Sequence, residues 1–246
     1  MNQQEILSAL YQMMLESDLF ELGDAEHAAC YNQRIKVVCR VMFGGQNEVA
    51  DWRQATKEQV RRLFFAVGNP NIEWLAAAGK GAMGRQQFDR AFDRDEGRTL
   101  KGIVEGIRNL SGEADGQRAL QLEEQFDEIV ANPRRPLVFH RAIAALHPEL
   151  VVPVPDLDKL NRFHNWLLNG VDQGNWFLAS MRVRTHLMEL LQGRTHYDVG
   201  AFAWFMTEAF RSDFNPQRQR EDCERQNLVW NCLEANGFRR PDYLQR

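Results

Sequence analysis

Three glycines with two basic neighbours form the pattern in this sequence that most resembles a phosphate-binding loop. Gly79, Gly81 and Gly84 have the spacing G-x-G-x-x-G, with Lys80 inside the pattern and Arg85 directly after it. A dinucleotide site needs this loop between a buried strand and a helix, but the preceding run NIEWLAAA favours helix. Lys80 is followed by glycine, which departs from the P-loop pattern. We therefore expect a bend between helices, with an anion contact through Lys80, Arg85 and the loop amides as the alternative.

Other basic residues are candidates for phosphate contact. Arg134 and Arg135 lie in NPRRP, and Arg141 follows shortly after them. Ordinary surface arginines are one interpretation and phosphate-binding arginines the other, because phosphate binding requires that the side chains cluster in space. Arg182 and Arg184 are two residues apart, so on a helix they diverge by about 200° and cannot form one clamp.

The cysteines do not follow a metal-binding pattern. Cys30 and Cys39 are nine residues apart, and so are Cys223 and Cys232. Nine residues of helix turn about half a revolution beyond whole turns, so paired thiols would face opposite sides. The sequence contains neither C-x-x-C nor H-E-x-x-H. We expect no metal and no cofactor.

Two histidines are the main candidates for acid–base chemistry. His140 and His147 share one helical face in FHRAIAALHPE, but a pair without a third ligand is typical of packing. PDLDK lacks the acidic-x-lysine element of a nuclease, and no G-x-S-x-G marks a serine hydrolase. We expect that the chain is not an enzyme. A catalytic site that uses His140, His147 or Cys39 is the alternative.

Composition describes an ordinary globular chain. The 246 residues are 44% hydrophobic and 26% charged, with a formal net charge of -4, which gives no overall basic imprint for nucleic acid. A local basic patch would still suffice for DNA binding. No apolar run reaches the roughly 18 residues of a membrane span. A signal peptide begins with a positively charged region, but no Lys or Arg precedes Arg34. We expect a cytoplasmic protein without membrane contact.

The segments that must position these residues show mainly the periodicity of helices. Apolar residues recur at helical spacing in several segments, and no pair of alternating strands is joined by a hairpin turn. The segment 35–43 fits a strand or a helix, and the prolines of ELVVPVPD predict an extended segment. The expected fold is all-α, a multi-helix globular domain over 1–246, or two packed lobes, 1–112 and 113–246. The expected helices include 5–20, 56–68, 118–130, 156–168 and 198–210. Leu10 and Phe126 lie on the apolar faces of the first and third of these, and Asp156 is the expected N-cap of the fourth.

Three stretches together resemble the helical region that precedes the ATPase in McrB-type AAA restriction proteins. They are FFAVGNPNIEWLAAAGKGAMGRQQFDR, RRPLVFHRAIAALHPELVVPVPDLDKLNRFHNWL and DVGAFAWFMTEAF. The resemblance covers about the middle two-thirds of the chain. The positions that carry it are Asn71, Gly79, Gly81, Phe88, Arg141, Ala142, Ala144, Ala145, Leu146, Pro148, Glu149, Lys159, Leu160 and Asn161.

The resemblance implies a helical module of a DNA restriction system without its motor, because the Walker A motif and the acidic strand of an ATPase are absent. We expect a non-enzymatic module of a prokaryotic defence or DNA-processing system that contacts DNA or a partner ATPase or nuclease subunit. DNA contact would use the phosphates, through Lys80, Arg85, Arg134, Arg135 and Arg141. The alternative is a protein–protein adaptor, whose acidic first thirty residues and aromatic run around Trp204 would be its contact surfaces.

Overall fold

Every regular element that the structure describes is helical. The computed structural model describes residues 2–16, 52–57, 60, 85–130, 136–154, 156–170, 174–210 and 219–244, and no strand occurs among them, which confirms the all-α prediction. The elements in chain order are α1 (Gln3–Glu16), η1 (Trp52–Gln54), α4 (Arg85–Asp93), α5 (Arg98–Arg108), η2 (Glu113–Asp115), α6 (Gly116–Val130), α7 (Pro136–Leu146), α8 (Leu157–Leu168), α9 (Trp176–Leu190), α10 (His196–Ala209), α11 (Gln219–Ala235) and η3 (Asp242–Leu244).

The apolar stripes of the sequence become the buried faces of these helices. Leu10 of α1 and Phe126 of α6 are buried, as their helical spacing predicts. Asp156 caps α8 by accepting a hydrogen bond from the backbone N–H of Lys159 at 3.0 Å, also as predicted. The segment 35–43 and most of the expected helix 56–68 lie outside the described residues.

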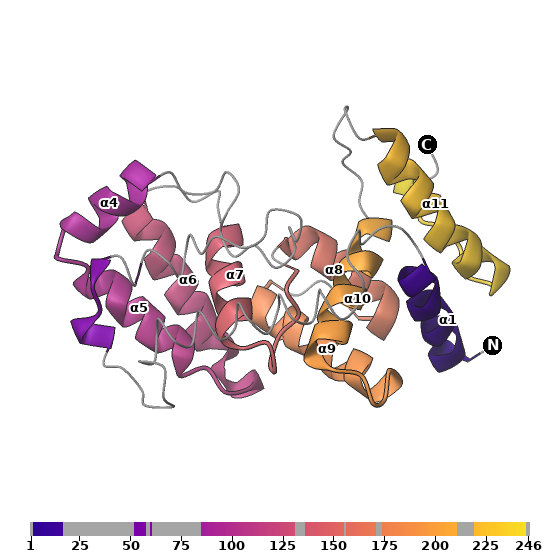
Figure 1. Cartoon of the computed structure of the whole chain (residues 1–246), viewed down its shortest axis with the longest axis horizontal. Helices are drawn as coiled ribbons and strands as arrows, with labels where there is room; N and C mark the ends of the chain where they lie inside the picture. Colours follow the sequence, from indigo (N-terminus) through magenta and orange to yellow (C-terminus); the bar gives the residue numbers. More distant parts are fainter. Residues whose placement is uncertain are drawn as a thin grey trace.

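The helices form an elongated molecule with α4 and α5 at one end and α1 and α11 at the other (Figure 1). α6 and α7 follow α4 and α5, and α8, α9 and α10 form the next part. α1 packs against α9, α10 and α11, so the first helix of the chain joins the last ones. No helix in the described part of the chain combines the length and the apolar character needed to cross a bilayer.

Two residues of α9 hold the segment 151–154, which is neither helix nor strand. Residues 148–150, which overlap the predicted extended stretch 149–156, form a turn instead. Ser180 accepts a hydrogen bond from the N–H of Val152 at 2.9 Å and donates one to its C=O at 3.0 Å. One turn earlier, the indole N–H of Trp176 donates to the C=O of Val154 at 2.6 Å. All four residues are buried, so these bonds satisfy backbone groups that no helix or strand pairs. α9 thus holds this segment in place along its length.

Candidate functional site

The predicted anion-binding residues lie mostly where the structure gives no description. Lys80, Arg134 and Arg135 are outside the described residues, as are Gly79, Gly81 and Gly84. Arg85 is the first residue of α4 and Arg141 lies within α7, but neither side chain is described. The involvement of these five basic residues in phosphate contact therefore stays a prediction.

A tight turn over 94–97 joins α4 to α5. Gly97 has φ 75° and Glu96 has φ 57°, so two successive residues take the left-handed conformation. A Cβ on Gly97 would lie 2.2 Å from the ring of Phe92, so the turn requires glycine there. Asp95 accepts hydrogen bonds from the N–H (3.1 Å) and the hydroxyl of Thr99, and the hydroxyl bond is the main cause of its lowered pKa, against a smaller opposing effect of burial.

Three arginines surround this turn, and we call Arg90, Arg94 and Arg98 the arginine corner. They belong to the end of α4, the turn and the start of α5, and all three side chains are exposed. Arg90 and Arg94 make no hydrogen bond or ion pair with any described residue, and the charge of Arg98 lies close enough to Asp95 to help lower its pKa. Asp95 and exposed Glu96 contribute two opposing charges within the same turn.

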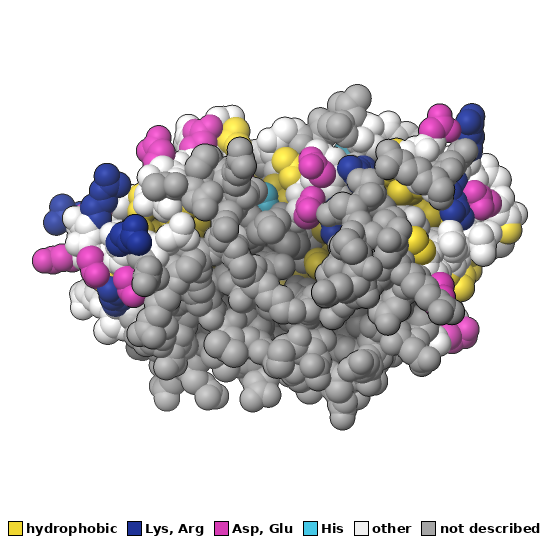
Figure 2. Space-filling model, turned by 90° about the horizontal axis from the view of Figure 1, so that it is seen from above, with side chains coloured by type: hydrophobic (Ala, Val, Ile, Leu, Met, Phe, Trp, Pro, Cys, Tyr) yellow, Lys and Arg dark blue, Asp and Glu magenta, His cyan; other side chains and the backbone are white. Residues whose placement is uncertain are grey.

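Two other cations beside the arginine corner are paired with carboxylates. Lys57 contacts Asp89 at 3.1 Å and Asp93 at 2.7 Å, and these two partners raise its pKa. Arg53 contacts Glu105 at 3.5 Å. Figure 2 shows Lys and Arg side chains interspersed with Asp and Glu at the end of the molecule formed by α4 and α5. Among the described residues at this end, the side chains of the arginine corner are basic groups that no ion pair neutralises.

His140 is buried between α6 and α9. Its exposed fraction is 1%, its Nε2 lies 3.1 Å from a carboxylate oxygen of Glu123, and its ring stacks on Trp176 at 4.4 Å. Asp127 is one turn from Glu123, and its Oδ1 is buried without a hydrogen-bond partner among the described residues. Burial and then the charge of Glu123 raise the pKa of Asp127, while the charge of His140 opposes them. The ring of His140 is therefore part of the packing between α6 and α9, with its Nε2 on Glu123.

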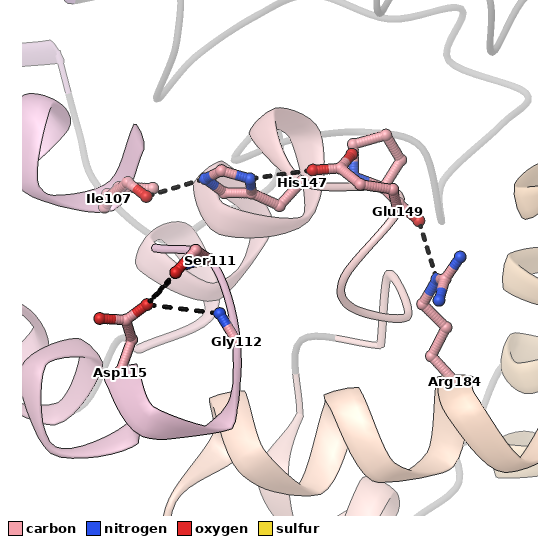
Figure 3. Close-up of polar contacts among 8 residues, drawn as sticks. Ile107, Ser111, Gly112, Asp115, His147, Glu149 and Arg184 are labelled. Atoms are coloured by element: carbon pink, nitrogen blue, oxygen red, sulfur yellow. Dashed lines mark hydrogen bonds and ion pairs between the residues drawn. The ribbon is translucent and has the colours of Figure 1, made fainter. Parts of the chain in front are cut away.

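His147 lies at the junction of α5 and α7, where Figure 3 shows its ring between two oxygen atoms. Its Nε2 is 2.8 Å from the carbonyl oxygen of Ile107, at the end of α5. Its Nδ1 is 3.1 Å from a carboxylate oxygen of Glu149. His140 and His147 are both buried, but they have separate partners, so they do not converge on one site.

Arg184 of α9 completes this junction. Its Nε donates to the carbonyl oxygen of Pro148 at 3.3 Å, and another of its nitrogens lies 2.6 Å from Nδ1 of His196. Burial and the charge of Arg184 lower the pKa of His196, against the charge of Glu149. Arg182 instead contacts Glu113 at 3.5 Å, so Arg182 and Arg184 have different partners, as their spacing predicts.

Asp115 fixes the loop that leaves α5 beside this junction. Its Oδ2 accepts hydrogen bonds from the N–H and hydroxyl of Ser111 at 2.7 and 2.9 Å and from the N–H of Gly112 at 3.3 Å (Figure 3). The bond from the Ser111 N–H is the largest cause of the lowered pKa of Asp115. The loop after Ile107 is therefore held by its own hydrogen bonds.

The described residues contain no group of three or more His, Cys, Asp or Glu side chains arranged to hold a metal ion. Cys223 and Cys232 are free thiols, and burial raises the pKa of Cys232. Cys30 and Cys39 lie outside the described residues.

Comparison of the chain with protein-family models, with curated proteins and with solved structures finds no match.

Proposed function

We propose that this chain is a non-catalytic helical module that contacts the phosphates of DNA through the arginine corner. The observation that carries the proposal is the exposure of Arg90, Arg94 and Arg98 at one turn, while the neighbouring Lys57 and Arg53 are neutralised by carboxylates. Exposed guanidinium groups on a fixed turn are suited to phosphate oxygens. Lys80 and Arg85 precede the corner in the sequence and would extend the same basic surface.

A role by contact is also supported by the two histidines that were candidates for acid–base chemistry. The ring of His140 stacks on Trp176 and its Nε2 contacts the carboxylate of Glu123. Both ring nitrogens of His147 contact oxygen atoms of the protein. A general acid or base must reach a substrate proton, which these rings would do only after losing those contacts.

The assignment to a prokaryotic defence or DNA-processing system rests on the resemblance to the McrB-type helical region. The same resemblance supports a partner ATPase or nuclease subunit, since the motor motifs are absent from this sequence.

Fluorescence anisotropy with a labelled DNA duplex tests the proposal. Binding of the wild-type chain should weaken steeply as salt increases, because phosphate contacts release counterions. For three contacts, the logarithmic slope of about 0.9 per phosphate accounts for about a fortyfold loss of affinity between roughly 50 and 200 mM salt. In the variant R90Q/R94Q/R98Q, the affinity should depend less steeply on salt, because the contribution of these three phosphate contacts is lost.

The matched control R118Q/R182Q/R239Q removes the same number of charges away from the corner. Arg118 is exposed on α6, Arg182 pairs with Glu113, and Arg239 pairs with Asp242. Equal losses in both variants would show a general effect of net charge and would contradict a specific role of the corner. No binding by the wild-type chain would exclude DNA contact, and recovery of a specific protein from native lysate would then favour the adaptor.

A further inference from the structure

The ring of His147 has an oxygen atom beside each of its two nitrogens. Its exposed fraction is 8%, and it follows the last residue of α7. α5 contributes the carbonyl oxygen of Ile107, and the turn after α7 contributes the carboxylate of Glu149, whose side chain is 49% exposed. Beyond Glu149, the charged or titratable groups of this junction are Arg184 from α9 and His196 from α10.

The partners of His147 determine where its hydrogen atoms must be. A carbonyl oxygen only accepts hydrogen bonds, so the contact of Nε2 with Ile107 requires a hydrogen on Nε2. An ionised carboxylate also only accepts, so the contact of Nδ1 with Glu149 requires a hydrogen on Nδ1. A neutral imidazole has one N–H and would place a lone pair against one of the two oxygens.

The carboxylate of Glu149 is the ionised partner in this arrangement. Burial alone would raise its pKa, but the hydrogen bond from His147, a backbone hydrogen bond and the charges of His147 and His196 together lower it. Above its lowered pKa the Glu149 carboxylate is therefore available to compensate a positive charge on His147.

We propose that His147 is held as a doubly protonated imidazolium, whose second proton closes a clamp between α5 and the turn that follows α7. When that proton leaves, the Nδ1 lone pair faces the Glu149 carboxylate and the two repel each other. The turn 147–149 also presents the carbonyl of Pro148 to Arg184, so loss of the proton loosens the attachment of the turn to α9. The junction is thus a pH-sensitive contact that closes in the protonated form and opens as pH rises.

Nitrogen-15 NMR of the full chain with labelled histidine tests the protonation directly. Near neutral pH we expect both ring nitrogens of His147, assigned by loss of their signals in H147Q, to show the chemical shifts of N–H groups. One nitrogen with the shift of an unprotonated ring nitrogen would overturn the proposal. If H147Q does not fold, E149Q assigns the same ring through the altered signal of Nδ1.

Urea unfolding at several pH values tests the clamp by a second route. If the folded chain retains a proton on His147 that the unfolded chain releases, wild-type stability falls as pH rises through the histidine range. We expect the ratio of folded to unfolded protein to fall about fivefold, the worth of one typical hydrogen bond. E149Q should lack this step, because its side-chain amide can donate to an unprotonated Nδ1.

The surface pair of His186 and Glu189 provides the matched control. Its atoms lie 3.8 Å apart with exposed fractions of 25% and 69%, so E189Q should retain the wild-type step. The same loss of the step in E149Q and E189Q would contradict a role specific to His147.

Discussion

Two glycines of α5 allow the contact between α5 and α6 to be tested by the same substitution at two positions. Gly102 is exposed, and a Cβ there would meet no atom within 4 Å. Gly106 is buried, and a Cβ there would lie 2.5, 3.0 and 3.3 Å from Cδ2, Cδ1 and Cγ of Leu122 on α6. Because both glycines lie inside one helix, the substitutions G102A and G106A differ chiefly in their surroundings.

The expected magnitudes follow from this difference. Replacing Gly by Ala inside a helix stabilises it by about 0.8–1 kcal/mol, and both variants gain this amount. In G106A the whole end of the Leu122 side chain must shift, and overpacking of this kind costs about 1–3 kcal/mol. We expect G102A to raise the free energy of unfolding by about 1 kcal/mol, and G106A to leave it unchanged or lower it by up to about 2 kcal/mol.

Urea unfolding followed by circular dichroism measures the free energy of unfolding of both variants. The decisive comparison introduces G106A into the L122A protein. Removing the Leu122 side chain removes the atoms that the new Cβ would meet, so G106A should stabilise the L122A protein by about the helix-propensity gain. Equal effects of G102A and G106A in the wild-type background would refute the close approach of α5 and α6 at this position.

Two further predictions concern buried polar groups. S180A should lower the free energy of unfolding by about 2–4 kcal/mol in urea titrations, because it leaves the N–H and C=O of Val152 buried and unpaired. S111A, which removes an exposed hydroxyl, should cost less than about 1 kcal/mol, and equal costs would contradict the role of Ser180. D127N should be more stable than wild type near neutral pH, because a raised pKa in the folded state means that the charged carboxylate opposes folding. The difference should vanish as pH falls and Asp127 becomes protonated, and an unchanged difference near pH 4 would contradict this assignment.

Local features of this fold could be predicted from the sequence because they depend on near neighbours. The apolar stripe of α6 and the capping of α8 by Asp156 each require only a few adjacent residues. Their physical causes are helical periodicity and the unpaired N–H groups of a helix start. Pairings between distant segments have no such local cause.

The partners of the polar residues illustrate this limit. Ser180 is 28 residues from Val152, and His147 is 40 residues from Ile107. Ser180 lies on a face of α9 and His147 directly after α7, but only the packing of helices shows which carbonyl each one meets. Sequence spacing alone cannot indicate the contact of a histidine with the end of a distant helix.

The sequence shows the three arginines of the arginine corner, but it does not show whether their charges are neutralised in the folded chain. The four-residue spacing of Arg90, Arg94 and Arg98 is visible in the sequence, as is the acidic content of the same stretch. Which cation each acid neutralises depends on the fold, because Asp93 pairs with Lys57, 36 residues away. The availability of the arginines is therefore a property of the folded chain.

The orientation of α5 relates the arginine corner to the His147 junction. α5 is 11 residues long, about 16 Å, with Arg98 at its positive end and Ile107 near its negative end. Asp95 already occupies the positive end through Thr99, so a phosphate at the corner would meet guanidinium groups and not free amides. At the other end, the carbonyl of Ile107 favours a positively charged ring on His147. Because screening limits each effect to its own end of the helix, DNA contact and the clamp are separate proposals, and failure of one leaves the other standing.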